Sequence, residues 1–300
     1  QKDSIDIVHF HMIWFFDKNV IAKALKKAGI PFVITTHGTY TKPHAYTGKR
    51  KFARVLYELD YLNMATEVHV LTREEGTGLQ KYGYKGNSFV VPNGVAFDEI
   101  PTERPTNVFD AKPYRDMIKA IWVGVLRDDK NLRTLIRSVA MLPQWIRDQL
   151  VVVMVGPDYR GNKAKYEALA TSLGVRDNFD FVGPKYEQEK FDALESADFF
   201  IMPSFTEGMS LAVLDALACA KPGVMTMGCG MNYYLDQDFF VPCEPYAQDI
   251  ARGIEALLAR REDWQAMGDR AHALCLDRFN WTSIAGEMAQ HYKRIADQSQ

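Results

Sequence analysis

Short apolar runs alternate with amphipathic stretches along the first third of the chain. Apolar runs at residues 5–10, 32–36, 68–71 and 88–91 have the length of strands, whereas residues 18–28, 49–64 and 73–82 carry apolar positions at helical spacing. Strand–helix–strand repetition is typical of a parallel sheet covered by helices. The first third therefore predicts an α/β domain.

A break follows at residues 92–113, which contain four prolines and little periodicity and predict a connection between domains. The alternation then restarts. We expect strands at 119–123, 151–155, 179–182, 199–202 and 223–227, and helices at 131–142, 163–173, 187–196, 210–219, 248–260, 262–278 and 283–295. The expected fold class is α/β, with two doubly wound Rossmann-like domains whose ligands lie beyond the carboxyl ends of the strands.

Composition agrees with a folded protein of two domains. The 300 residues are 47% apolar and 25% charged, with a formal net charge of -2, which argues against a disordered chain and against a general nucleic-acid binder. The four cysteines form no C-x-x-C pair, so a zinc knuckle or redox dithiol is not expected and a reducing cytoplasm is the default. No apolar run reaches the roughly 18 residues that a membrane-spanning helix needs.

Charge is distributed unevenly between the two halves. Residues 1–93 carry 13 basic and 8 acidic residues, a net charge of +5, and the excess is concentrated in Lys42, Lys49, Arg50, Lys51 and Arg54. This segment is either a solvated helix face or a surface for an anionic membrane or an anionic lipid-linked substrate. The second interpretation predicts a cytoplasmic protein attached peripherally to the inner face of the membrane.

The segment 203–218 contains the most informative candidate chemistry. It begins where the apolar strand ADFFIM ends and continues into a helix, so the amides at residues 209–211 are expected to point outward and to bind an anion such as phosphate. Glu207 lies in the loop, where its carboxylate can accept hydrogen bonds from sugar hydroxyls. Asp215 lies about two turns into the helix and could reach the far end of an extended ligand. The alternative is that a carboxylate near the helix start only complements the helix dipole.

Together with motifs elsewhere, this segment resembles the retaining, nucleotide-sugar-dependent glycosyltransferases of family 4. Glu207 and Asp215 have the spacing of that family's paired acidic residues. Further resemblance is carried by residues 6–11 (DIVHFH), 36–38 (THG), 91–95 (VPNGV), 123–131 (VGVLRDDKN), 155–157 (VGP), 181–183 (FVG) and 279–281 (FNW). It covers essentially the whole chain and implies the GT-B architecture of two facing Rossmann-like domains.

The resemblance implies roles for individual residues. Glu207 and His37 are the expected catalytic residues, with Glu207 orienting the donor sugar. Lys130, with Arg127 as a helper, would neutralise the donor diphosphate as charge builds on the leaving oxygen. The expected donor-binding residues are Gly124, Arg127, Lys130, Gly208, Met209, Ser210, Leu211 and Asp215, and the candidate acceptor or cleft residues are His11 and Gly38. The Gly228-Cys229-Gly230 turn either offers further amides or is an ordinary loop.

The expected function is transfer of a hexose from a nucleotide diphosphate sugar to a glycan or lipid-linked acceptor with retention, in cell-surface polysaccharide or glycolipid synthesis, without metal or other cofactor. The family's basic residue after the phosphate-loop glycine is Val125 here, and its second glutamate is Asp215. These departures favour one alternative, a non-catalytic subunit that binds nucleotide sugar or glycan. A dinucleotide-dependent oxidoreductase is disfavoured because no G-x-G-x-x-G follows the first strand.

The expected domains are an acceptor-side domain at 1–108, a donor-binding domain at 109–278 and a C-terminal helix at 279–300 that packs on the first domain. The family normally has further strands before the equivalent of Asp6, so the first domain is expected to be incomplete at its N-terminus.

Overall fold

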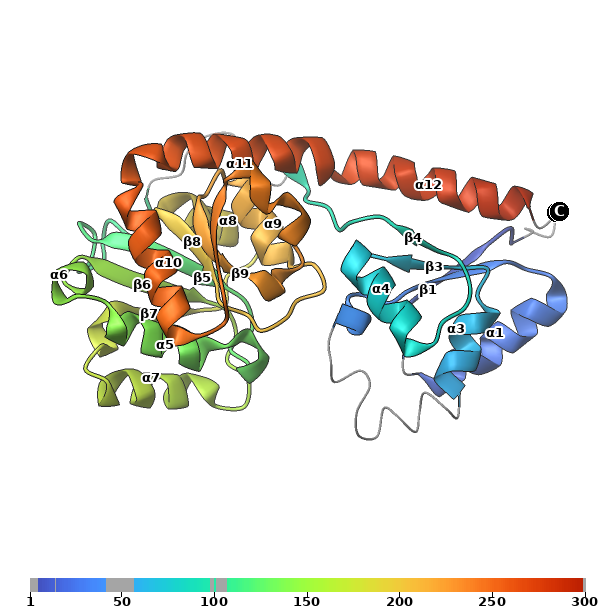
Figure 1. The fold of residues 1–300 in the computed structure, drawn as a ribbon, viewed down its shortest axis with the longest axis horizontal. Coiled ribbons are helices and arrows are strands. Elements are labelled where there is room, and N and C mark those ends of the chain that lie inside the picture. The colour runs from blue at the N-terminus through green and yellow to red at the C-terminus, as the bar shows by residue number, and fades with distance from the viewer. Residues whose placement is uncertain (1–4, 14, 42–56, 98–99, 101–106, 299–300) are drawn as a thin grey trace. The chain divides into compact units, whose positions relative to one another are not determined.

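The computed structural model describes residues 5–13, 15–41, 57–97, 100 and 107–298. It divides into two compact units. The first comprises Gln1–Asn93, Glu207–Met209 and Trp281–Gln300, and the second comprises Gly94–Thr206 and Ser210–Asn280. Each unit contains one parallel β-sheet with helices packed on it, which confirms the predicted α/β class (Figure 1).

The first unit is built on a four-stranded parallel sheet of order β1-β2-β3-β4. Its strands are β1 (Val8–His11), β2 (Phe32–Thr35), β3 (Glu67–Val70) and β4 (Ser88–Val90), and its helices are α1 (Phe16–Ala28), the 3₁₀ turn η1 (Thr39–Thr41), α3 (Leu59–Met64), α4 (Arg73–Tyr82) and α12 (Trp281–Asp297). The sequential order follows from short crossovers, each of which returns the chain to the next position in the sheet.

The alternation of side chains along β2 gives this sheet two buried faces. Phe32 and Ile34 join a cluster with residues of α1, α3 and α4, whereas Val33 between them joins a second cluster with Ile284 and Ile295 of α12. Successive strand residues point to opposite faces, so a run that is apolar at every position requires cover on both sides. The C-terminal helix supplies that cover on one face.

Polar contacts fix α12 to this sheet. Arg294 of α12 donates two hydrogen bonds to the Glu67 carboxylate of β3, at 2.8 and 2.6 Å. The imidazole of His291 stacks on Phe89 of β4 with ring centroids 4.0 Å apart. Glu67 is buried, so its charge depends on Arg294 for compensation.

The second unit is built on a six-stranded parallel sheet of order β10-β9-β8-β5-β6-β7. Its strands are β5 (Ile118–Val123), β6 (Leu150–Val155), β7 (Phe179–Gly183), β8 (Phe199–Met202), β9 (Gly223–Thr226) and β10 (Phe240–Cys243). Its main helices are α5 (Leu132–Met141), α6 (Gln144–Arg147), α7 (Asn162–Ser172), α8 (Glu187–Ser196), α9 (Leu211–Ala218), α10 (Ala247–Ala259) and α11 (Trp264–Arg278).

Helices cover both faces of this second sheet. Helices α5, α7 and α10 pack together on one face, and α8, α9 and α11 lie on the other (Figure 1). Every residue of β6 is buried, as are the first five of β5, as expected for central strands enclosed on both sides. The unit is therefore a three-layer α/β sandwich, and only the edges of its sheet remain for ligands.

The structure adds one strand that the apolar pattern did not predict. Strand β10 contains Pro242, which lacks an amide hydrogen, and it pairs only with β9 at the edge of the sheet. An edge position tolerates a proline that an interior strand would not. The basic residues Lys42, Lys49, Arg50, Lys51 and Arg54 lie outside the described residues. Within the described chain, no helix is both long and apolar enough to cross a membrane.

The Arg294–Glu67 pair leads to a prediction on stability. We expect Arg294→Met to lower the free energy of unfolding by about 1–2 kcal/mol, less than for a fully buried pair because the arginine is partly exposed. Arg278→Met is the matched control, since its ion pair with Asp277 is exposed on both sides, and it should change stability by less than about 0.5 kcal/mol. Urea denaturation monitored by circular dichroism measures both. Equal midpoints for the two variants would contradict the assigned role of Arg294.

Candidate functional site

The strand order of the second unit locates a candidate site within that unit. Strand β5 pairs with β6 on one side and with β8 on the other, so the chain moves outward in one direction from β5 and in the opposite direction from β8. This reversal is the topological switch point at which doubly wound sheets bind ligands. Two loops of this unit meet there at the carboxyl edge: residues 124–131 after β5 and residues 203–206 after β8.

The edge is lined by backbone rather than by side chains. Gly156, which follows β6, has φ +149°, and a Cβ atom there would lie 1.6 Å from the carbonyl oxygen of Gly124. The amide of Gly156 also donates to the Gly183 carbonyl oxygen at 2.9 Å. Only glycine fits this approach. The chain segments after β5 and β6 therefore pack backbone to backbone, and of the glycines at these strand ends only Gly183 of β7 has open space where a side chain would lie.

Asn131 fixes the loop after β5. It adopts a left-handed conformation (φ 59°) and is buried, and its side-chain amide donates to the carbonyl oxygens of Pro203 at 2.9 Å and Pro245 at 3.1 Å. These bonds join the loops after β5, β8 and β10. In the sequence, Asn131 is recognisable only as part of a motif. Its tolerance of positive φ was the available signal for a loop-closing role.

The two basic candidates in this loop have different surroundings. Lys130 is half-buried at the end of the 3₁₀ turn η5 (Asp128–Lys130). The Arg127 guanidinium donates to both carboxylate oxygens of Asp129, at 2.6 and 2.5 Å. A bidentate pair already compensates the charge of Arg127. Arg127 is therefore available to an anion only if it leaves Asp129.

The acidic candidates lie on either side of the start of α9. Glu207 is buried in the loop, and Ser210 is the residue immediately before the helix. Asp215 is also buried, and its carboxylate accepts a hydrogen bond from Lys190 of α8 at 2.7 Å. The first amides of a helix have no hydrogen-bond partner within the helix, so the N-terminus of α9 is suited to bind an anion. Leu211 is exposed there.

The glycine turn after β9 packs against the loop after β8. A Cβ atom on Gly228 would lie 2.1 Å from the Phe205 carbonyl oxygen. The turn comprises η7 (Met227–Cys229) followed by Gly230, and its Cys229 is buried. This close approach explains why residue 228 is a glycine without invoking a role in binding a ligand. It does not decide whether the turn offers amides to a ligand or is an ordinary loop.

The remaining candidates belong to the first unit, with which Glu207, Gly208 and Met209 also group. His11 ends β1 and His37 follows β2, and their ring nitrogens Nδ1 and Nε2 lie 3.1 Å apart. His37 and Gly38 both have positive φ, 50° and 74°. Adjacent parallel strands thus bring this pair together at one carboxyl edge.

A buried carboxylate that the sequence analysis did not select supports the His37 loop. Glu75 of α4 accepts hydrogen bonds from the Thr36 hydroxyl at 2.5 Å and from the Leu71 amide at 2.9 Å. Burial raises the pKa of Glu75, and hydrogen bonds from Thr36, Leu71, Gly38 and Tyr40 oppose that rise. Thr72-x-x-Glu75 is a capping pattern, and the Thr72 hydroxyl does accept from the Glu75 amide. This capping pattern is the sequence feature from which the position of Glu75 could have been predicted.

A chain of hydrogen bonds runs beneath the histidine pair, and its direction is fixed by its last acceptor. The Val91 carbonyl can only accept, so His69 Nε2 donates to it at 2.7 Å and His69 Nδ1 must accept from the Thr35 hydroxyl at 2.8 Å. Thr35 then accepts from His9 Nε2 at 2.5 Å, and His9 Nδ1 accepts from the Tyr292 hydroxyl at 2.5 Å. Each imidazole therefore donates once and accepts once.

That arrangement requires neutral rings. Burial and the neighbouring histidines lower the pKa of His9 to about 3. Burial lowers the pKa of His69 to about 4, although its bond to Val91 opposes the change. Burial, His11 and Lys18 also lower the pKa of His37. His9 has both ring nitrogens engaged, and the described residues contain no group of three or more histidine, cysteine or acidic side chains that could hold a metal ion.

Comparison with known proteins identifies the family. The family of glycosyl transferases group 1 matches residues 103–273, and Glycosyltransferase Family 4 matches residues 1–99. The chain is 28% identical to a D-inositol 3-phosphate glycosyltransferase of Geodermatophilus obscurus, over 98% of this chain and 67% of that protein. It is 26% identical to the lipopolysaccharide glucosyltransferase WaaG of Escherichia coli, over 70% of this chain and 56% of that protein. The chain thus spans about two thirds or less of these relatives.

Solved structures share the fold. Sucrose-phosphate synthase of Thermosynechococcus elongatus superposes with a TM-score of 0.80 at 21% identity, covering 97% of this chain and 73% of that one. HepE of Anabaena, crystallised with UDP and glucose, gives a TM-score of 0.80 at 18% identity, covering 92% and 75%. These neighbours confirm the predicted fold class, which is the GT-B fold with two Rossmann-like domains.

The neutral histidines predict a stability that falls in acid. His9 and His69 have lower pKa values in the folded state than the unperturbed 6.5, so below about pH 6.5 the unfolded state binds more protons and gains stability. Their contribution should be complete above about pH 6.5 and lost progressively toward pH 4. We expect the parent to lose more thermal stability between about pH 7.5 and pH 5 than a His9→Gln/His69→Gln variant. Thermal denaturation measures this, with His272→Gln as control. Parallel curves for parent and double variant would contradict it.

Proposed function

The chain belongs to the glycosyl transferases group 1 family, and we propose that it transfers a hexose from a nucleoside diphosphate sugar to a glycan or lipid-linked acceptor. We propose further that the anomeric configuration is retained and that the product serves cell-surface polysaccharide or glycolipid synthesis. A lipid-linked acceptor would place the reaction at the inner face of the membrane. No metal or other cofactor is part of this proposal.

The observation that carries the proposal is the composition of the switch-point edge in the second unit. Gly156 packs directly against the backbone of Gly124, and Gly183 at the end of β7 has open space where a side chain would lie. Lys130 supplies positive charge in the loop after β5, and the amides at the start of α9 supply donors on the loop after β8. Such donors stabilise the charge that accumulates on a departing diphosphate.

The neutral state of His37 suits a sugar substrate. Burial and nearby positive charge lower its pKa, so near neutral pH the ring is uncharged; Nε2 pairs with His11, and Nδ1 is the nitrogen proposed to meet a sugar hydroxyl. A sugar hydroxyl both donates and accepts, so it can pair with this nitrogen in either tautomer. Glu207 provides a carboxylate acceptor for further hydroxyls, and both residues belong to the same compact unit.

The nucleotide end of the donor is assigned to α9. Lys190 holds the Asp215 carboxylate in place by its hydrogen bond of 2.7 Å, so a ribose hydroxyl would meet an oriented acceptor. HepE of Anabaena, which shares the fold, was crystallised with UDP and glucose, so uridine nucleotides are the first donors to test.

A non-catalytic nucleotide-sugar or glycan-binding subunit is the second candidate. Val125 replaces a basic residue of the family's phosphate loop, and the charge of Asp215 is compensated by Lys190. Release of nucleoside diphosphate from UDP-hexose, GDP-hexose and ADP-hexose in water distinguishes the two, because hydrolysis needs no knowledge of the acceptor. Binding of a donor without any release would favour the binding subunit.

Glu207 gives the first test of the mechanism. Glu207→Ala should slow donor cleavage about 100-fold, as expected for loss of a positioned polar group in the transition state, while nucleoside diphosphate still binds. Glu189→Ala, which removes an exposed carboxylate on α8, is the matched control and should leave the rate unchanged. A Glu207→Ala enzyme with the parent rate would exclude this residue from the chemistry.

Lys130 gives the second test. Loss of a charge-assisted contact worth about 1.5–3 kcal/mol should weaken binding of UDP by roughly 10–150-fold in Lys130→Ala and leave uridine binding nearly unchanged. Lys112→Ala is the control. Lys112 precedes β5 and pairs with Asp180 near the start of β7, so it lies at the amino edge of the sheet, opposite the proposed donor site. Isothermal titration calorimetry measures the affinities of the parent and both variants for UDP and for uridine. An equal loss for UDP and uridine would show that Lys130 does not bind the diphosphate.

A further inference from the structure

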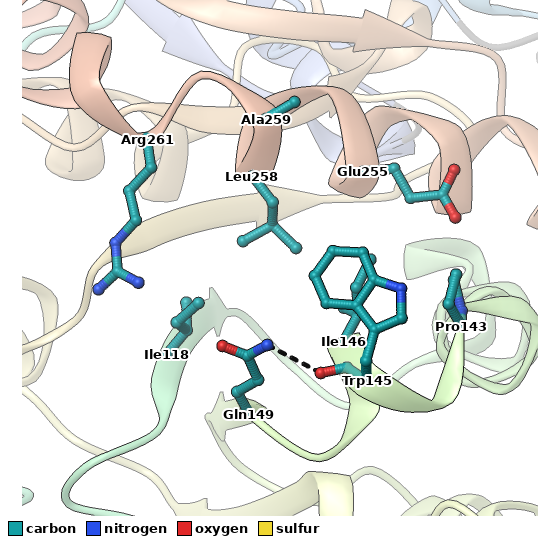
Figure 2. A pocket seen from close by; sticks show the side chains of 9 residues that line it. All are labelled: Ile118, Pro143, Trp145, Ile146, Gln149, Glu255, Leu258, Ala259 and Arg261. Carbon is teal, nitrogen blue, oxygen red and sulfur yellow. Dashed lines mark hydrogen bonds between the residues drawn. The ribbon is translucent and has the colours of Figure 1, made fainter.

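A second hollow lies in the same unit at the edge opposite the switch point. It has a volume of about 450 Å³ and lies near the first residue of β5, Ile118, and near Gln149, which precedes β6. Helix α6 borders one side and the end of α10 the other (Figure 2). Because β5 spans six residues at about 3.3 Å each, this hollow lies roughly 20 Å from the carboxyl edge. It is therefore separate from the proposed donor site.

The floor of the hollow is apolar and includes an exposed indole. Trp145 of α6 has 63% of its surface exposed, although it lies beside the apolar side chains of Ile118 and Leu258. Its neighbour Ile146 is buried in the core, which fixes the short helix and so the position of the indole. Figure 2 shows the indole and Leu258 facing the same space. A large aromatic group held at the mouth of a hollow is suited to contact a ligand.

The rim carries three planar polar groups. Gln149 lies below the hollow, and Glu255 and Arg261 lie above it at opposite ends (Figure 2). The Gln149 amide donates to the Trp145 carbonyl oxygen at 2.8 Å, which orients it and uses one of its two N–H donors. The rim thus offers a carboxylate that accepts, a guanidinium that donates and an amide that does both. Its two formal charges cancel.

This combination selects among possible occupants by chemistry. An acyl chain or an apolar protein surface would cover Glu255 and Arg261 without satisfying their charges, which is costly. A strongly anionic or cationic ligand would meet one rim charge of its own sign. A saccharide satisfies both parts: its hydroxyls donate to Glu255 and accept from Arg261, and its ring C–H groups carry partial positive charge toward the negative face of an indole.

We propose that this hollow is a second saccharide site, which binds a hexopyranose oligosaccharide through Trp145, Gln149, Glu255 and Arg261. Binding there requires no turnover, so the proposal goes beyond the transfer reaction and does not depend on it. In the enzyme, such a site would hold a long glycan to the protein while a different part of that glycan reacts.

Ligand-observed saturation-transfer NMR on the full chain tests the proposal, with maltoheptaose, cellohexaose and mannohexaose as separate probes at millimolar concentration. At least one should receive saturation from the protein, and Trp145→Ala should weaken its binding about tenfold or more. Glu255→Gln should also weaken it. Trp281→Ala, which removes another exposed tryptophan on α12, is the matched control and should bind like the parent. Excess UDP should leave the signal unchanged.

Donor hydrolysis and thermal midpoint are measured on the same variants. Trp145→Ala should keep the parent values of both, because its side chain is exposed and lies at the edge opposite the donor. Absence of binding for all three saccharides overturns the proposal, as does binding that survives Trp145→Ala or disappears with UDP. If the parent binds no saccharide but binds dodecanoate or self-associates, and Trp145→Ala abolishes that binding or association, the hollow is instead assigned to an acyl chain or to a second copy of the chain.

Discussion

The pairing of β5 with both β6 and β8 is the constraint on which the second unit depends. Strand β5 is central, so the chain must leave it in one direction and return on its other side to start β8. The loops after these two strands therefore emerge together, and Asn131 joins them through the Pro203 carbonyl. Residues 72 positions apart in the chain become neighbours at one edge. No single motif in the sequence contains this arrangement.

Among the described residues of the first unit, the polar groups near the carboxyl edge of the sheet are buried without an ion pair, whereas Glu67 at the start of β3 is paired with Arg294. The central strands of this unit are enclosed on both faces, yet they carry Thr35 and His69 inward. These groups satisfy one another in a single directed chain that ends on a backbone carbonyl. Glu75 does the same for the loop at His37, through hydrogen bonds instead of a counter-charge. The histidine and threonine side chains at this edge are thus held in defined positions before any ligand arrives.

Much of the fold could be predicted because apolar periodicity is local. Helices α4 and α8 and strand β8 have the expected limits, most other elements differ by one or two residues, and β1 begins three residues later than expected. Of the helix expected at 49–64, the described residues contain α3 (Leu59–Met64), and residues 49–56 lie outside them. Strand β10 was missed because Pro242 is acceptable only at an edge, and edges are defined by topology. The motif residues near Gly124 and Lys130 were recognisable from strand–loop–helix position. The Arg127–Asp129 pair, the Lys190–Asp215 pair and the support from Glu75 were not, because each depends on side-chain geometry or on contacts distant in sequence.

The directed chain from Tyr292 to Val91 connects the last helix to the first strands. Because every member donates in the same sense, no imidazole can change tautomer alone, and a reversal would leave His69 facing the Val91 carbonyl with a lone pair. Tyr292 supplies the first proton of the series. The Val91 carbonyl therefore sets which nitrogen of each ring bears hydrogen, and the docking of α12 supplies the donor that His9 Nδ1 accepts. The chemical shift of His9 Nδ1 thus reports whether α12 is packed on the sheet.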